Sequence, residues 1–119
     1  MAQTRVASKE DALRILREAL PELRRRYGVI RIALFGSFAH GQPGPKSDVD
    51  VLVELTRPLG LEFVDLVYDL ERRLGRRVEV TTFDTLRRNL QHPRYREVAQ
   101  HIQRTLTDVE ATTGQALPR

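Results

Sequence analysis

Near the start of the chain, apolar residues recur every three or four positions, which predicts an amphipathic helix. Ser8 stands before this stripe as the expected N-cap. Pro21 falls inside the stripe and cannot donate a helical hydrogen bond. We therefore expect one helix over residues 9–19 and a second, short helix from Pro21 to Tyr27 that ends at Gly28. The apolar positions of the stripe are Leu13, Leu16, Leu20 and Leu23.

Three short segments then predict strands. Val29 to Phe35 is a β-branched, apolar run, and Arg76 to Thr81 is a shorter segment of the same kind. Between them, polar and apolar residues alternate over residues 48–55, as in a strand with two unlike faces. The apolar side of this strand must face the core, and we expect the opposite side to be open. The apolar side is Val49, Val51, Val53 and Leu55, and the other side is Asp48, Asp50, Leu52 and Glu54.

Helical spacing returns in the second half of the chain. It predicts helices from Phe63 to Leu74 and from Phe83 to Leu90, the latter capped by Asp84. A last helix should carry apolar residues at Tyr95, Val98, Ile102, Leu106 and Val109. The element order predicts an α/β (α+β) fold in which helices pack on one side of a small mixed β-sheet.

The composition fits a single globular domain, since 119 residues with 40% hydrophobic and 30% charged side chains form one modest core. The absence of cysteine excludes disulfides and thiolate metal sites. The apolar runs are too short to span a membrane, and residues 1–10 lack the apolar centre of a signal peptide. We expect a cytoplasmic protein with one domain over residues 1–111 and a flexible tail over residues 112–119.

Arginine dominates the basic residues, because lysine occurs only at positions 9 and 46 among twenty lysines and arginines. The formal net charge is +4. Most arginines are interleaved with glutamate on predicted helices, which is typical of a solvated, ion-paired surface. An electropositive face for a nucleotide, RNA or an acidic partner is the other interpretation.

Two carboxylates, Asp48 and Asp50, stand at the start of the second strand and point to the same face. Such a pair suits Mg²⁺, which prefers one or two carboxylates together with water and substrate phosphates. A solvated surface pair has the same spacing, so the motif alone leaves both interpretations open. Gly36 and Ser37 follow the preceding strand, where glycine allows close approach of a ligand and a helix start can bind phosphate. A simple Gly–Ser turn is the alternative.

Together, Gly36-Ser37 and the later Asp48-x-Asp50 resemble the signature of the DNA polymerase β-like nucleotidyltransferase superfamily. The segment Leu34 to Gly41, followed by Ser47 to Val53, is similar to its minimal, single-domain MntA-type branch, whose members are generally encoded beside a HEPN-domain toxin. The resemblance extends roughly from Leu13 to Leu106. One variation is His40, where this family often has arginine.

The resemblance implies a minimal nucleotidyltransferase fold and ATP as substrate. Gly36 and Ser37 would hold the β- and γ-phosphates, while Asp48 and Asp50 would ligate two Mg²⁺ ions. A third carboxylate on a neighbouring strand would complete the metal site and take the proton from the acceptor hydroxyl. The matching residue is Glu79, where the family usually has aspartate.

Glu79 is one methylene longer than the usual aspartate, which moves its carboxylate by roughly 1.5 Å. A misplacement of about 1 Å can reduce a rate on the order of a hundredfold. One interpretation is therefore a catalytic and metal-binding Glu79 with reduced activity. The other is an outward-facing strand residue paired with Arg77.

By resemblance, the leading hypothesis is an antitoxin that transfers AMP from ATP to a tyrosine of a cognate HEPN ribonuclease toxin. In this hypothesis the chain forms a hetero-oligomer with the toxin or a homodimer. The alternative is a catalytically weak binding protein that neutralises the toxin by complex formation, as the departure at Glu79 would favour. Direct nucleic-acid binding through arginine is the least favoured hypothesis.

Overall fold

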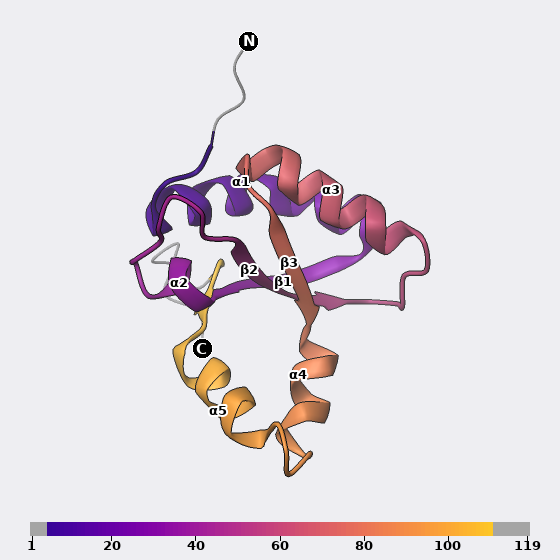
Figure 1. Ribbon diagram of the computed structural model, residues 1–119. Coiled ribbons are helices and arrows are strands. Elements are labelled where there is room, and N and C mark those ends of the chain that lie inside the picture. Colours follow the sequence, from indigo (N-terminus) through magenta and orange to yellow (C-terminus); the bar gives the residue numbers. More distant parts are fainter. Residues whose placement is uncertain (1–4, 111–119) are drawn as a thin grey trace, which may run out of the picture.

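The computed structural model describes residues 5–110, which form a β-sheet with helices on both of its faces (Figure 1). This mixed α/β architecture confirms the predicted fold class. The expected tail over residues 112–119 lies outside the described residues. In chain order the elements are α1 (Lys9–Tyr27), β1 (Val29–Phe35), α2 (Gly36–Ala39), β2 (Val49–Leu55), α3 (Glu62–Leu74), β3 (Val78–Thr82), α4 (Phe83–Leu90), α5 (Arg96–Thr105) and β4 (Thr107–Asp108).

The sheet is mixed, with the strand order β3-β2-β1-β4. β1 is antiparallel to both β2 and β4, whereas β2 is parallel to β3. A parallel neighbour requires a crossover connection, and α3 provides it between β2 and β3. The three predicted strands are confirmed, and their ends differ from the expected bounds by at most two residues.

α1 continues through Pro21, so the predicted break into two helices is wrong. A proline inside a helix is about 3 kcal/mol less favourable than alanine. The leucine stripe runs along the whole helix and is buried, and each buried leucine contributes roughly 1.5–3 kcal/mol. Burial of the stripe therefore outweighs the missing hydrogen bond. Ser8 caps the helix as predicted, since its hydroxyl accepts a 3.1 Å hydrogen bond from the Asp11 N–H.

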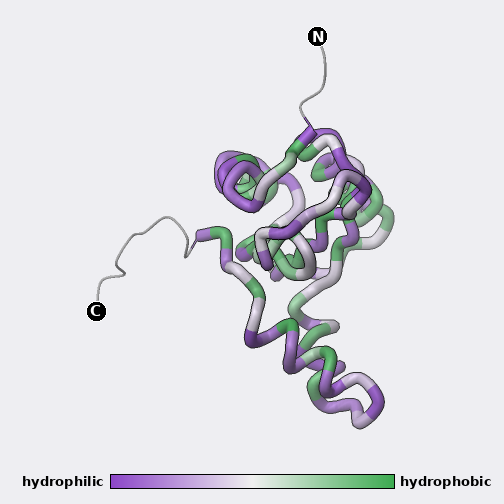
Figure 2. The backbone as a smooth tube through the Cα atoms, turned by 60° about the vertical axis from the view of Figure 1, so that its left-hand side comes forward, coloured by the Kyte–Doolittle hydropathy of each residue, from purple (hydrophilic) through white to green (hydrophobic). Residues whose placement is uncertain are grey.

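Helices cover both faces of the sheet, which corrects the prediction that they pack on one side. The apolar side of β2 lies in the larger core with α1 and α3, as expected. On the opposite side, Leu52 is buried in a second cluster with residues of α4 and α5. Hydrophobic and hydrophilic segments alternate along this helix pair (Figure 2). Leu52 thus closes the middle of the Asp side of β2, which is accessible around Asp48 and Asp50 at one end and at the half-buried Glu54 near the other.

The last helix ends at Thr105, so the predicted helix through Leu106 and Val109 is too long. Thr107 and Asp108 instead form β4, and the Val109 N–H donates a 2.9 Å hydrogen bond to the Ile32 carbonyl. Leu106 packs against the second cluster, whereas Val109 is buried in the larger core. Two residues at helical spacing thus enter different cores, which their spacing does not reveal. Within residues 5–110, no helix is long and apolar enough to cross a membrane.

Candidate active site

Gly36 connects β1 directly to α2 and lies against the second aspartate of the motif. Its φ of 73° falls in the left-handed region that favours glycine. A Cβ at this position would collide with the Asp50 carboxylate oxygen Oδ2 and would lie 3.1 Å from its Cγ. Ser37 follows in the first turn of α2 and is partly exposed. The glycine thus permits a close approach between the strand-to-helix turn and Asp50.

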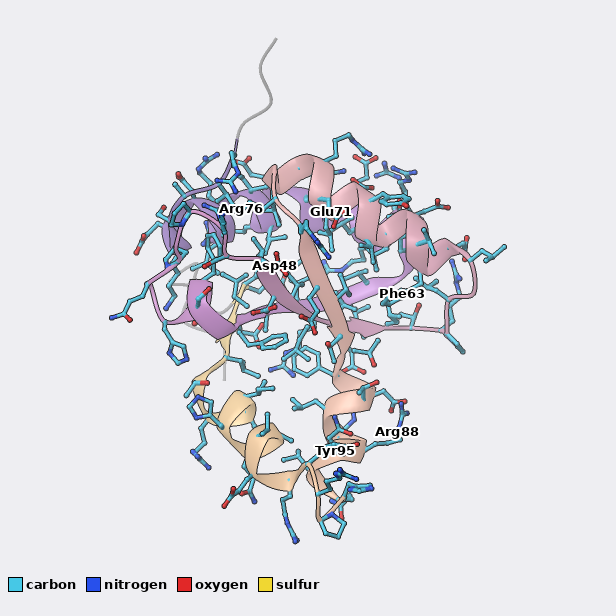
Figure 3. The ribbon with its side chains drawn as sticks, in the orientation of Figure 1. Asp48, Phe63, Glu71, Arg76, Arg88 and Tyr95 are labelled. Carbon is cyan, nitrogen blue, oxygen red and sulfur yellow. The ribbon has the colours of Figure 1, made fainter. Side chains whose placement is uncertain are left out.

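The sheet register brings three predicted site residues together. Asp50 is the central partner, because it pairs with Phe35 of β1 on one side and with Glu79 of β3 on the other. Glu79 is exposed, and its carboxyl is hydrogen-bonded to that of Asp50. Asp48 is also exposed and lies just before β2, near the middle of the molecule and beside β3 (Figure 3). The three carboxylates therefore gather at one end of the open face.

The two neighbouring carboxylates disfavour the charged form of Asp50. Burial raises the pKa of Asp50 to about 6, and the negative charges of Glu79 and Asp48 and the hydrogen bond that protonated Asp50 donates to Glu79 act in the same direction. A divalent cation between such groups would relieve this repulsion, so the donor set suits a hard metal ion with oxygen ligands. Among the described residues, no three acidic or histidine side chains form a preformed metal cage. Since Asp48 and Glu79 are exposed, the three carboxylates form an open carboxylate platform that solvent can reach.

Glu79 is exposed, as the alternative interpretation expected, but within residues 5–110 it forms no ion pair with Arg77 and interacts with Asp50 instead. Asp84 lies in the first turn of α4, but the cap of this helix is Thr82, whose hydroxyl accepts a 3.0 Å hydrogen bond from the Thr85 N–H. The predicted capping role of Asp84 is therefore wrong. Threonine and aspartate are both favoured N-cap residues, so the sequence alone did not distinguish Thr82 from Asp84.

Arg76 supports the site, although the sequence suggests only the first residue of the third strand, beside Arg77. Only 8% of its surface is exposed. Its Nε donates a 2.6 Å hydrogen bond to the Val6 carbonyl, and its Nη1 donates to the carbonyls of Gly44 at 3.1 Å and Ser47 at 2.9 Å. Ser47 directly precedes Asp48, so Arg76 holds the loop that carries this carboxylate. In the sequence, the one local indication of this role is that Arg76 directly follows Gly75, the C-cap of α3.

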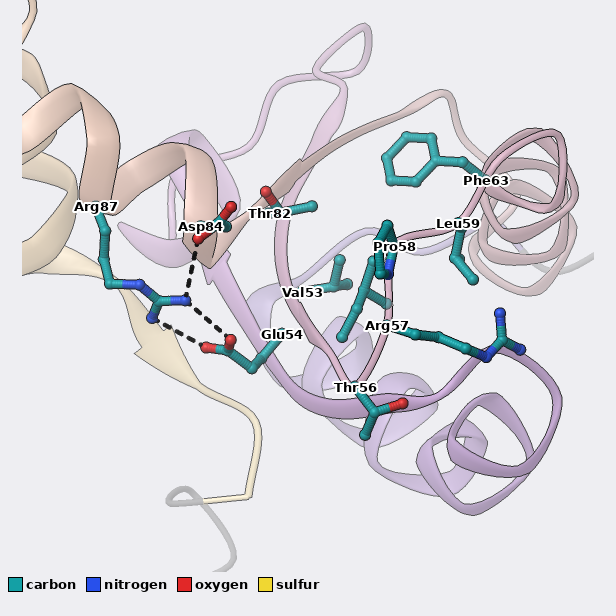
Figure 4. A pocket seen from close by; sticks show the side chains of 11 residues that line it. Val53, Glu54, Thr56, Arg57, Pro58, Leu59, Phe63, Thr82, Asp84 and Arg87 are labelled. Atoms are coloured by element: carbon teal, nitrogen blue, oxygen red, sulfur yellow. Dashed lines mark hydrogen bonds and ion pairs between the residues drawn. The ribbon is translucent and has the colours of Figure 1, made fainter.

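A cavity of about 360 Å³ lies at the other end of β2, away from the three carboxylates (Figure 4). Its wall includes Glu54, which accepts hydrogen bonds of 3.2 and 3.0 Å from the Arg87 guanidinium. Arg57 lines the same cavity and forms a 3.1 Å ion pair with Glu62. These charged groups already neutralise one another, so cavity size does not identify the site here.

Comparisons with known proteins agree with this geometry. The family described as nucleotidyltransferase domain matches residues 16–105. The chain is similar to protein adenylyltransferase MntA of Thermococcus cleftensis, with 38% identity over 90 residues, which cover 75% of this chain and 91% of that protein.

Two solved structures share the fold. One, described as a minimal nucleotidyltransferase, matches with a TM-score of 0.62 and 32% identity and covers 84% of this chain and 94% of its own. A chain from a toxin–antitoxin MntA–HpeT complex matches with a TM-score of 0.55 over 87% of this chain and 73% of its own. At 16% identity, this second likeness shows the fold alone.

Proposed function

The chain belongs to the nucleotidyltransferase domain family, in its minimal MntA-type branch, and we propose that it transfers AMP from ATP to a hydroxyl of a partner protein. The observation that supports this most is the position of Asp50, which lies between Gly36 and Glu79 at the open end of the sheet. Nucleotidyltransferase activity follows from the family. The site residues, the metal and the acceptor are our assignments.

Asp48, Asp50 and Glu79 would hold two Mg²⁺ ions, which supply charge neutralisation for the phosphates and the leaving group. The backbone N–H groups at Gly36 and Ser37 would bind the β- and γ-phosphates. The acceptor oxygen attacks the α-phosphorus, a new O–P bond forms, and the bond from this phosphorus to the β-phosphate oxygen breaks. Pyrophosphate leaves, and Glu79 takes the proton of the acceptor hydroxyl.

The proposed acceptor is a tyrosine of a HEPN-domain toxin, and the chain is its antitoxin within a hetero-oligomer. The similar protein of Thermococcus cleftensis is named as a protein adenylyltransferase, which supports a protein acceptor. A domain of this size contributes few surfaces beyond the site itself, so the partner would position its own tyrosine. We propose a cytoplasmic location and a functional unit over residues 1–111.

Labelling of the purified toxin tests this proposal. Incubation of both proteins with Mg²⁺ and ATP labelled at the α-phosphate should transfer the label to the toxin, and mass spectrometry should locate it on tyrosine. Chelation of Mg²⁺ and the double substitution Asp48→Asn/Asp50→Asn should each remove the label. Absence of label where the complex demonstrably forms would refute AMP transfer.

The second candidate is neutralisation by binding alone, and Glu79 in place of aspartate is the observation that favours it. The two functions differ in the behaviour of Glu79→Gln, which keeps the size of the side chain but cannot take a proton. If the chain is an active enzyme, this variant loses transfer by about 10²–10⁴-fold and fails to neutralise the toxin. If neutralisation persists in both Glu79→Gln and the double aspartate variant, the chain acts by masking.

A further inference from the structure

A second cavity, of about 190 Å³, lies between the sheet and the α4–α5 pair. Phe35 and Leu52 of the sheet line it together with Glu79, and Asn89 and Ala99 line it from α4 and α5. It is distinct from the larger cavity near Arg57, with which it shares none of these residues. Its walls are mostly apolar, so it does not suit a phosphate group.

The cavity begins where the carboxylate platform ends. Phe35 directly precedes Gly36 and pairs with Asp50 across the sheet, while Glu79 borders both the platform and the cavity. Leu52 lies two residues beyond Asp50 on the same face of β2, roughly 7 Å further along the strand. This is about the length of a ribose between an α-phosphate and its base. A nucleotide with its phosphates at the platform could thus place its base in the cavity.

The polar groups of the cavity favour a heteroaromatic base over a phenol ring. The Asn89 side chain has an NH₂ donor group and a carbonyl acceptor, and within residues 5–110 this amide makes no hydrogen bond to another residue. Asparagine can bind the 6-amino group and a ring nitrogen of adenine at the same time. A tyrosine side chain has a single hydroxyl, which must reach Glu79 to react and would leave the Asn89 amide unpaired.

We propose that this cavity is the adenine site of the enzyme and that Asn89 selects adenine through its amide. The inference rests on the proposed transfer from ATP, since the phosphates of the same nucleotide must occupy the carboxylate platform. Phe35, Leu52 and Ala99 surround the faces of the base, and Asn89 recognises its edge. The cavity thereby fixes both the choice of nucleotide and the position of its α-phosphorus.

Binding measurements with three Mg²⁺ complexes test the adenine site: ATP, purine riboside triphosphate, which lacks the 6-amino group, and tripolyphosphate, which has no nucleoside. The wild-type protein should bind ATP about tenfold more tightly than purine riboside triphosphate, because one side of a bidentate contact is lost. Asn89→Ala should remove this preference. Ala99→Leu fills the cavity and should weaken ATP binding at least tenfold, while tripolyphosphate binding stays unchanged in both variants.

Gln100→Leu is the matched control, because it adds the same side chain to an exposed neighbouring position of α5 and should leave all three affinities unchanged. Should Ala99→Leu fail to fold, Asn89→Ala still decides the question. If neither Asn89→Ala nor Ala99→Leu changes the ATP affinity, the adenine site is refuted. If these variants also lose toxin labelling, the cavity instead binds the acceptor. Failure of the wild-type protein to bind tripolyphosphate would instead refute the phosphate site on which the proposed function depends.

Discussion

Gly36 and Gly41 have nearly the same left-handed backbone, with φ values of 73° and 75°, but different surroundings. A Cβ at Gly36 would collide with the Asp50 carboxylate, whereas one at Gly41 would have no other atom within 4 Å. Alanine in this conformation costs roughly 1–2 kcal/mol on backbone grounds. We expect Gly41→Ala to show this loss alone. Gly36→Ala should lose more stability, because Asp50 must also move.

Urea denaturation of the two glycine variants would measure these losses, and calorimetry would measure their affinity for Mg²⁺–ATP. Gly41→Ala should bind like the wild type. Gly36→Ala should bind about tenfold more weakly, a loss of about 1.4 kcal/mol, because Asp50 is displaced from its position beside the turn. Equal effects of the two substitutions on stability and binding would argue against any special role for the contact between Gly36 and Asp50.

Asp50 gives the metal-free protein a defined pH dependence. Its pKa in the folded state is about 6, above its ordinary value of 3.8, so the folded state holds this proton more tightly than the unfolded state. The resulting stability is complete below pH 3.8 and is lost as the pH rises through 6. Asp50→Asn should therefore stabilise the metal-free protein at pH 7 by on the order of 1–2 kcal/mol, with little gain at pH 4.

Thermal denaturation in EDTA at both pH values would measure the effect of Asp50→Asn, and NMR titration of the wild-type carboxyl would locate its pKa directly. Addition of Mg²⁺ should lower that pKa, because a cation favours the charged form. A lower stability of Asp50→Asn at pH 7 would contradict the repulsion among the three carboxylates.

At the residue scale, the motif residues could be predicted because their chemistry is local. Gly36, Asp48 and Asp50 stand in one short segment whose strands and turn follow from the alternation of side chains. The hydrogen bond between Asp50 and Glu79 depends on the register of two strands separated by a helix, which no local pattern determines. Burial of Arg76 likewise depends on where residues 6 and 44–47 meet.

At the scale of elements, Arg76 follows α3 and forms hydrogen bonds with Val6 in the N-terminal segment and with the loop before β2. Burial lowers its pKa, and the guanidinium also lies over the Phe38 ring at 5.1 Å. Replacement by methionine leaves the Val6, Gly44 and Ser47 carbonyls without this donor. Hydrogen bonds to charged groups contribute about 1.5–3 kcal/mol each. We expect Arg76→Met to lose on the order of 3 kcal/mol of stability.

Arg77→Met is the control for Arg76→Met, because Arg77 is the adjacent residue and its side chain is exposed. This control should change the free energy of unfolding in urea by less than about 0.5 kcal/mol. Arg76→Met should also weaken Mg²⁺–ATP binding, since the loop that carries Asp48 is no longer held. Similar losses in both variants would show that Arg76 has no specific role in holding this loop.

The elements that the sequence did not predict correctly share one physical cause, which is competition between local and tertiary preferences. Pro21 predicted a break in the helix, but the leucines of α1 are buried on both sides of Pro21, and the helix continues. Val109 fits the helical spacing, but residues 107–109 instead form backbone hydrogen bonds with the edge of β1. The helix therefore ends before them, and Thr107 and Asp108 form β4. Elements without such competition, such as α3 with its glycine cap, agree closely with the prediction.

At the scale of the whole molecule, the interpretation of the arginines as an ion-paired surface is confirmed for three runs but not for residues 76–77, where Arg76 is buried. Each of the runs at residues 24–26, 72–73 and 87–88 contains an arginine paired with a carboxylate. Asp69 of α3, only 2% exposed, accepts hydrogen bonds from Arg26 and Tyr27 of α1. Some of the basic residues therefore hold helices together rather than forming a free electropositive face.

Because the carboxylate platform is negative, ATP should bind the whole protein well only together with a divalent cation. Ligand at about 100 times its Kd stabilises a folded protein by about 2.7 kcal/mol. For a domain of this size we expect Mg²⁺ and ATP together to raise Tm by roughly 10 °C. Each alone should give less than half of this shift, since free ATP is repelled by the carboxylates and free Mg²⁺ lacks its phosphate ligands.

Thermal denaturation should be measured without ligand, with Mg²⁺, with ATP and with both, for the wild type and for Asp48→Asn/Asp50→Asn. The comparison separates the joint effect of Mg²⁺ and ATP from unspecific effects of ATP. The double variant keeps the sheet and its apolar side, so it should fold and show no joint shift. Asp84→Asn, on the exposed first turn of α4, should shift like the wild type. An equal rise in Tm with ATP in EDTA would mean that ATP binds without the metal. The carboxylate platform would then have no part in holding the nucleotide.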